Sequence, residues 1–128
     1  MDKILIVDDS PVLRKILRFH LEQESGWEVC GEAENGQIAI EKVQELRPDL
    51  VVLDLAMPVM NGLEAARQIR LIAPRTITVL FTMQSCEALL PEAIAAGIKD
   101  VVSKSAGAGA LLASLKALLP AVIRSRPN

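Results

Sequence analysis

The sequence predicts a doubly wound α/β domain, in which a parallel sheet is covered by helices on both faces. The length of 128 residues is typical of one domain. Short apolar runs alternate with stretches whose apolar residues recur at helical spacing. The runs are almost wholly apolar, as in strands that are buried on both faces of a parallel sheet. We therefore predict five strand-helix units in a single domain over residues 1–128, with no linker dividing it.

The predicted strands are the apolar runs Ile4 to Val7, Trp27 to Cys30, Leu50 to Leu53, Ile77 to Phe81 and Val101 to Val102. Helical spacing of apolar residues follows in the stretches Pro11 to Leu21, Ile38 to Leu46, Leu63 to Ile72 and Leu111 to Val122. The strand-helix alternation accounts for the repeat of about 25 residues, without an internal duplication.

Helix-capping residues support these boundaries. Ser10 can cap the first helix, with Pro11 in its first turn, and Asn61 can cap the third. Asn-Gly at 35–36 and 61–62 could also mark hairpins, but the helical pattern after each pair favours helix starts. Pro91 lies inside the expected fourth helix, so we predict a short helix that begins near this proline or is kinked there.

Reactive side chains follow four of the predicted strands. Asp8 and Asp9 follow the first, Asp54 the third, Thr82 the fourth and Lys104 the fifth. Ligands of open α/β sheets bind beyond the carboxyl ends of the strands, so these groups converge if the first and third strands flank the switch point. Each acid taken singly could instead be a cap or turn residue. Together, three carboxylates would repel one another unless cations offset them, which indicates a functional site.

The chemistry of this group favours Mg²⁺ as a cofactor, because that ion prefers oxygen ligands and keeps several waters. No calcium-binding loop is present, and His20 is the single histidine, which excludes a typical zinc site. Asp54 can then act as a nucleophile toward a phosphoryl group. Lys104 and the Thr82 hydroxyl can stabilise the transferred oxygens.

Composition excludes several other classes. The net charge of −2 argues against direct binding of nucleic acid by this domain. The N-terminal apolar run is too short for a signal peptide, and no run is long enough to enter a membrane. Cys30 and Cys86 lack metal or redox spacing, and reduced thiols in the cytoplasm are the expectation.

The motifs VDDS, VVLDLAMPVMNG, VLFT and VVSK together resemble the receiver domain of bacterial two-component response regulators. The similarity extends from about Lys3 to Ile123. It implies a flavodoxin-like sheet of order 2-1-3-4-5 with five helices, the order found in a chemotaxis member of this family. It also implies a cytoplasmic signalling switch that catalyses only its own phosphorylation and dephosphorylation, with a sensor histidine kinase as partner.

The resemblance assigns a role to each site residue. Asp54 would be the phosphoacceptor; Asp9 and Asp54 would bind Mg²⁺ directly, with Asp8 nearby, often through water. The main-chain carbonyl of Ala56 would be a further ligand. Thr82 would move toward the phosphoryl group on activation, and Lys104 would pair with it.

Some positions depart from the common pattern of the family. Val101 stands where an aromatic switch residue is frequent, and Ser105 stands where many members have a proline after a cis bond, so we leave that peptide geometry open. Asn61 replaces a frequent Asp. Ala56 and Gln84 flank the site, and we expect them to tune the lifetime of the phosphoryl group through water access.

The sequence says less about how the domain would pass a signal to a partner or to a linked domain. The apolar last helix fits core packing or, alternatively, a homodimer or partner surface formed with the fourth helix and fifth strand. The stretch KSAGAGALL also resembles receivers joined to helix-turn-helix domains, which would make the chain an N-terminal fragment of a DNA-binding regulator. An aspartate-nucleophile phosphatase is a further alternative, but Ala56 stands where it would need a second acid. An inert scaffold would be expected to have lost Asp9, Asp54 or Lys104.

Overall fold

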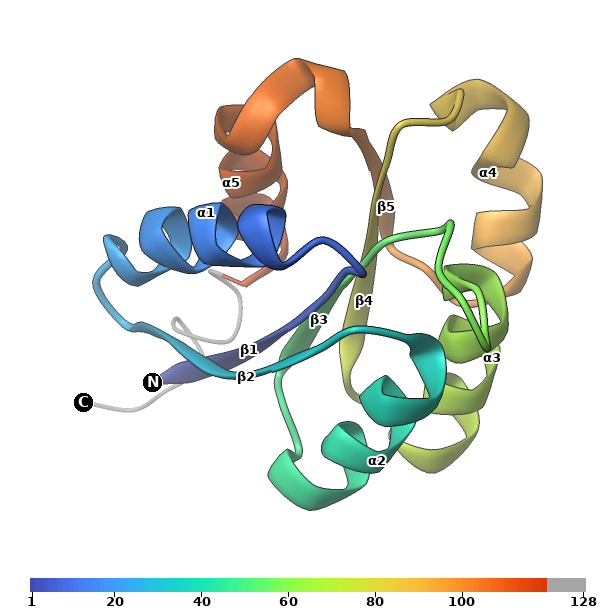
Figure 1. Ribbon diagram of the computed structural model, residues 1–128, viewed down its shortest axis with the longest axis horizontal. Coiled ribbons are helices and arrows are strands. Elements are labelled where there is room, and N and C mark those ends of the chain that lie inside the picture. The colour runs from blue at the N-terminus through green and yellow to red at the C-terminus, as the bar shows by residue number, and fades with distance from the viewer. Residues whose placement is uncertain (120–128) are drawn as a thin grey trace.

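The structure, a computed structural model, describes residues 1–119 and contains one sheet of five parallel strands (Figure 1). The strands are β1 (Asp2–Val7), β2 (Trp27–Ala33), β3 (Leu50–Leu53), β4 (Ile77–Thr82) and β5 (Asp100–Ser103). Their order is β2-β1-β3-β4-β5, with every neighbouring pair parallel. The predicted sheet and its order 2-1-3-4-5 are thereby confirmed.

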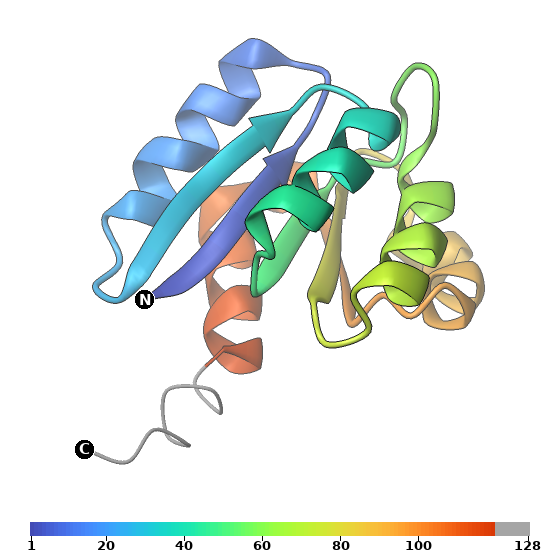
Figure 2. The same cartoon turned by 90° about the horizontal axis from the view of Figure 1, so that it is seen from below.

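Five α-helices flank this sheet: α1 (Pro11–Glu22), α2 (Gly36–Leu46), α3 (Gly62–Ile72), α4 (Cys86–Ala95) and α5 (Gly107–Leu118). A short 3₁₀ turn, Lys104–Ala106, precedes α5. Helices α1 and α5 cover one face of the sheet, and α2, α3 and α4 cover the other (Figures 1 and 2). Their buried apolar residues form two core clusters, one on each face. This arrangement is the doubly wound architecture that the sequence predicts.

Alternate residues of each central strand supply the two halves of the core. Leu5 and Val7 of β1 face the layer of α2, α3 and α4, whereas Ile4 and Ile6 face α1 and α5. These four side chains are at most 1% exposed. Burial of each contributes roughly 1.5–3 kcal/mol, so the sheet provides a rigid base for the loops at its ends.

Side-chain caps begin the first three helices; those at Ser10 and Asn61 were predicted. The Ser10 Oγ accepts a hydrogen bond from Leu13 N at 3.2 Å, and the Asn61 Oδ1 accepts one from Glu64 N at 3.0 Å. Asn35 caps α2 through Ile38 N at 2.9 Å. Both Asn-Gly pairs therefore start helices rather than hairpins, and each cap contributes about 1 kcal/mol.

The prediction of a short fourth helix at Pro91 is wrong. Helix α4 begins at Cys86, is capped by Ser85 and continues through Pro91 to Ala95. Pro91 cannot donate to the carbonyl of Glu87, one turn earlier. Both residues are exposed, so water can hydrate this carbonyl and the helix continues at the cost of one internal bond.

The structure also bears on the Lys104–Ser105 peptide, on membrane-spanning helices and on the end of the domain. Among residues 1–119 no peptide bond is cis, so the Lys104–Ser105 bond is trans. Within the same range, no helix has the length and apolar character needed to span a membrane. The predicted helical position Val122 and the domain end near Ile123 lie outside the described residues.

Candidate functional site

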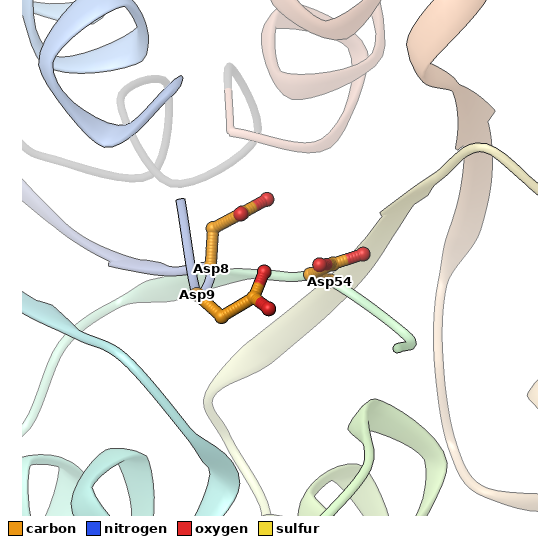
Figure 3. A group of neighbouring side chains, drawn as sticks. All are labelled: Asp8, Asp9 and Asp54. Atoms are coloured by element: carbon orange, nitrogen blue, oxygen red, sulfur yellow. The ribbon is translucent and has the colours of Figure 1, made fainter. Parts of the chain in front are cut away.

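Three carboxylates meet at the carboxyl edge of the sheet. Asp8 and Asp9 directly follow β1, and Asp54 directly follows β3, its neighbour in the sheet. One carboxylate oxygen of each lies within 4.8 Å of the others (Figure 3). Asp8 and Asp54 are only 2% and 5% exposed, whereas Asp9 is exposed to solvent. The predicted convergence of these three acids is therefore confirmed.

Lys104 bridges two of these acids. Its Nζ lies 2.9 Å from Asp8 Oδ2 and 3.2 Å from Asp54 Oδ1. Burial of the ammonium group alone would lower the pKa of Lys104, but the hydrogen bond to Asp8 and the charge of Asp54 outweigh it and raise the pKa. The lysine is thus held in its charged form between the two buried carboxylates.

Ionisation of Asp54 is disfavoured in this environment. Burial and the nearby charge of Asp8 raise its pKa above the ordinary value, and the contact with Lys104 offsets this only in part. Its main-chain N–H donates to Val7 O at 2.9 Å, which ties the residue to β1. A further cation at this site would therefore stabilise the ionised form of Asp54.

Asp8 is fixed through both its main chain and its side chain. Its Oδ1 accepts a hydrogen bond from Ser10 N at 2.9 Å, and its carbonyl oxygen accepts one from Arg14 Nη1 at 2.6 Å. Arg14 lies in the first turns of α1 and pairs with Glu32 of β2 at 2.9 Å. We did not predict Arg14 from the sequence. The available signal was an arginine one helical turn after the Ser10 cap of the acidic loop.

Thr82 is the last residue of β4 and is 1% exposed. Its Oγ1 accepts a hydrogen bond from Gln84 N at 3.1 Å, which orients the hydroxyl without using its proton. Ala56 and Gln84, the residues expected to control water access, are both exposed. Val101, in place of an aromatic residue, is half-buried and packs against the core layer of α2, α3 and α4.

The loop from β3 to α3 is fitted closely to Asp54. Gly62 N donates to Leu55 O at 2.9 Å, and a β-carbon at position 62 would overlap the carbonyl oxygen of Asp54. Within the loop, Met60 N donates to Pro58 O at 2.7 Å around Val59, which has a φ of 70°. This is the geometry of a γ-turn, rare for a β-branched residue. The sequence motif places Gly62 in this loop but does not show that contact.

The donor set fits a hard divalent cation. Carboxylate oxygens are the ligands that Mg²⁺ prefers, and the exposed Asp9 leaves room for the waters that this ion retains. The carbonyl of Ala56 belongs to an exposed loop residue two positions after Asp54. No histidine or cysteine belongs to the acidic cluster found in residues 1–119, which disfavours a softer metal.

Comparison with known proteins identifies the same family that the sequence motifs resemble. The family model for the response regulator receiver domain matches residues 4–116. The chain is 41% identical over 102 residues to the chemotaxis protein CheY of Thermotoga maritima, covering 80% of this chain and 84% of that protein. It is 35% identical to the transcriptional regulatory protein YdfI of Bacillus subtilis, over all of this chain but only 60% of YdfI. Of a protein-glutamate methylesterase from a Nocardioides species, 39% identical, the chain spans 34%.

Solved structures show the same fold. A LuxR-family two-component response regulator from Aurantimonas sp. SI85-9A1 superposes with a TM-score of 0.88 at 34% identity, covering 93% of this chain and 85% of that one. The response regulator domain of Thermotoga maritima CheB gives a TM-score of 0.84 at 28% identity, covering 99% of both chains. The arrangement of strands, the acidic cluster and these similarities agree, and the chain belongs to the response regulator receiver domain family.

Proposed function

We propose that this receiver domain is a phosphorylation-controlled signalling switch that accepts a phosphoryl group on Asp54. The observation that carries the proposal is the placement of Asp54: a buried carboxylate at a strand end, 3.2 Å from Lys104 and clustered with Asp8 and Asp9. A carboxylate is costly to bury in this way. The presence of the whole acidic group around a buried carboxylate is best explained by chemistry at Asp54.

The proposed donor is the phosphohistidine of a sensor histidine kinase. An Asp54 carboxylate oxygen attacks the phosphorus, an O–P bond forms, and the P–N bond to the donor imidazole breaks. The imidazole nitrogen keeps the electron pair and takes a proton. Attack of water on the acyl phosphate later releases inorganic phosphate and restores Asp54.

The residues around Asp54 act by position and charge. The Lys104 ammonium group lies 3.2 Å from Asp54 Oδ1, close enough to pair with an oxygen of a phosphoryl group bound to Asp54. The Thr82 hydroxyl, whose proton is not used by Gln84, can donate to another oxygen. Such pre-organised donors and cations supply most of the catalysis in phosphoryl transfer.

We propose that Asp9, Asp54 and the carbonyl of Ala56 would hold Mg²⁺, with Asp8 nearby or bound through water. When bound, this ion neutralises the charge that develops on the transferred oxygens. For the chain itself, the cation would relieve the repulsion between Asp8 and Asp54 that raises the pKa of Asp54. The ion would also offset the burial of Asp54 and so favour its ionised form, which is the form that attacks.

Signalling would follow from a change of partners at the site. Lys104 would leave its bridging position to pair with the phosphoryl group, and Thr82 would move toward it, shifting the equilibrium between two conformations. Val101 cannot act as an aromatic switch, so the shift would pass through β4, β5 and the loops that follow them. Ala56 and Gln84 would set the lifetime by admitting or excluding water.

An exposed apolar surface on α1 fits the docking of the kinase. Val12, Ile16 and Phe19 are 68%, 46% and 62% exposed, and their spacing places them on one side of the helix. This helix begins directly after the acidic loop. A donor protein with a complementary apolar surface could bury these side chains while its histidine reaches Asp54.

The output is proposed to use either a protein partner or a linked DNA-binding domain. The similarity to the LuxR-family regulator and to the regulatory protein YdfI supports the second arrangement. In either arrangement the domain would act in the cytoplasm and would not itself contact DNA. A homodimer or partner would use α4, β5 and α5, where Leu90 and Ile94 of α4 are 46% and 63% exposed.

Incubation with Mg²⁺ and acetyl phosphate, followed by intact-mass measurement over time, tests the proposal. We expect a single transient phosphoryl adduct, absent from Asp54→Ala and from samples with EDTA. Glu28→Gln, which changes an exposed carboxylate of β2, should retain the adduct. No adduct with any acyl phosphate would favour a scaffold, and rapid turnover of phosphate esters would favour a phosphatase.

A further inference from the structure

A chain of charged side chains leads from the edge of the sheet to the back of the acidic site. Arg14 and Arg18, one turn apart on α1, both contact Glu32 of β2: Arg14 Nε lies 2.9 Å from Oε1, and Arg18 Nε lies 2.8 Å from Oε2. Glu32 therefore uses both carboxylate oxygens to hold two guanidinium groups.

Only one of these two arginines reaches the site. Arg14 Nη1 donates to the carbonyl oxygen of Asp8 at 2.6 Å, whereas Arg18 contacts Glu22 and the carbonyl of Val29. The Arg14 side chain is 16% exposed and the Arg18 side chain 36%. The two residues thus share a chemistry and a partner but differ in their contact with the acidic loop.

The Arg14 contact acts on the peptide that joins Asp8 to Asp9. The carbonyl of Asp8 and the nitrogen of Asp9 belong to one planar peptide group. A contact that fixes this carbonyl therefore also fixes the orientation of the main chain where Asp9 begins. Asp9 is exposed, and within residues 1–119 no hydrogen bond or ion pair holds its carboxylate. Its direction therefore depends on the main chain.

We propose that Arg14, held by Glu32, is a positioning residue for the divalent-cation site, because it fixes the Asp8–Asp9 peptide and so aims Asp9 toward Asp54. The inference rests on the proposed function, which assigns the cation to these acids. Arginine suits this role because its planar fork can contact a carboxylate and a carbonyl together, which a lysine ammonium cannot do in the same geometry.

The state of Glu32 agrees with a firmly held guanidinium. Burial alone would raise the pKa of Glu32, but hydrogen bonds from Arg18 and Arg14 outweigh it and lower the pKa. Glu32 therefore stays ionised at neutral pH. Arg14 also borders a pocket of about 330 Å³ that is lined by residues of α1, β2 and α2.

Charge and position make opposite predictions for this residue. A nearby positive charge repels a cation, so neutralising Arg14 would by charge alone tighten metal binding. Loss of positioning would weaken it. Arg14→Lys separates the two effects because it keeps the charge and removes the fork. Arg18→Lys makes the same change on the same partner without any contact to Asp8.

Binding of Mn²⁺ alone, followed by the electron paramagnetic resonance signal of the free ion, tests the inference without phosphorylation. We expect Arg14→Lys to raise the Mn²⁺ dissociation constant about tenfold, as for other supports behind a metal ligand. Arg18→Lys should change it less than about twofold. Urea unfolding in EDTA should give similar midpoints for the two variants.

A second variant keeps the inference testable if Arg14→Lys does not fold. Glu32→Gln leaves Arg14 in place but removes the charge that holds it, and we expect about threefold weaker Mn²⁺ binding. Equal binding by wild type and the folded variants at Arg14 or Glu32 would overturn the positioning role. Failure of the wild type to bind Mn²⁺ would instead contradict the cation site, and with it both the proposed function and this inference.

Discussion

Gly62 lies directly against the main chain of Asp54. A β-carbon at position 62 would overlap the Asp54 carbonyl oxygen and would lie 3.0 Å from its carbonyl carbon and 3.1 Å from the Cα of Leu55. All three neighbours are backbone atoms, which cannot move aside as the end of a flexible side chain could. The start of α3 and the candidate phosphoacceptor are therefore fixed relative to each other by the absence of a side chain.

Gly62→Ala should separate α3 from the main chain of Asp54. We expect a loss of about 1–3 kcal/mol in the free energy of unfolding, as for other overpacked sites, and slower phosphorylation by acetyl phosphate. Gly109→Ala is the matched control, because a β-carbon at this helical position meets nothing within 4 Å. The control should be more stable by about 0.5–1 kcal/mol. Equal stability of the two variants would contradict the close contact.

Asp54→Asn should stabilise the fold in the absence of metal. The raised pKa of Asp54 means that its ionisation opposes folding. Below the ordinary pKa of an aspartate, both folded and unfolded forms are protonated and the penalty vanishes. It grows as the pH rises through that value and is complete above the raised folded pKa. Urea unfolding in EDTA should therefore show a stability gain for Asp54→Asn at pH 8 that disappears near pH 3.

The metal dependence of the same variant provides the control. Mg²⁺ should stabilise the wild type by binding to the folded form, and should stabilise Asp54→Asn much less. Glu28→Gln, at an exposed position, should behave like the wild type at each pH and Mg²⁺ concentration. A variant that is less stable than the wild type in EDTA at pH 8 would show that the Lys104 contact outweighs burial.

Ile16→Glu should impair phosphorylation by a kinase without affecting the site chemistry. The side chain is exposed on α1, so its replacement should leave the free energy of unfolding within about 0.5 kcal/mol. With a sensor kinase chosen because it phosphorylates the wild-type chain, transfer should slow by about tenfold. The rate with acetyl phosphate should not change. Leu71→Glu, at an apolar position of α3 that is 82% exposed, should leave both rates unchanged.

Pro91→Ala should restore the hydrogen bond that α4 lacks. The new N–H can donate to the carbonyl of Glu87, and the exposed position leaves the core untouched. We expect a gain of about 1–2 kcal/mol in urea unfolding, since the helical penalty of proline exceeds the entropy that its ring removes from the unfolded chain. An unchanged or lower stability would indicate that residues before Pro91 are not part of a continuous helix.

The elements that could be predicted from the sequence are those with a strong local pattern. The apolar runs located all five strands. The Ser10 and Asn61 caps and the Asn35-Gly36 pair located three helix starts. Strand β2 extends beyond the predicted end to Ala33, because pairing with β1 continues past a register shift where the sequence is no longer apolar. The strand order came from the family resemblance, since spacing alone does not fix which strands are neighbours.

In the candidate site, too, some residues could be predicted from a local pattern and others could not. The four residues Asp8, Asp9, Asp54 and Lys104 could be predicted because each ends an apolar run, and parallel strands bring such ends to one edge. Arg14 could not be predicted, because it contacts a main-chain carbonyl, and every residue type has one. The continuation of α4 through Pro91 could not be predicted either, because the local pattern does not show that Glu87, whose carbonyl loses its partner, is exposed and can be hydrated.

Lys104, which bridges Asp8 and Asp54, is the cation to be counted against the three carboxylates of the site. Three carboxylates and one ammonium leave a surplus of two negative charges, which one divalent ion would cancel and a monovalent ion would not. A phosphoryl group then adds negative charge to a neutral cluster. Under the proposed function, Lys104 would exchange a carboxylate partner for a phosphoryl oxygen, so the signal would reach this edge of the sheet as one added negative charge and one moved cation.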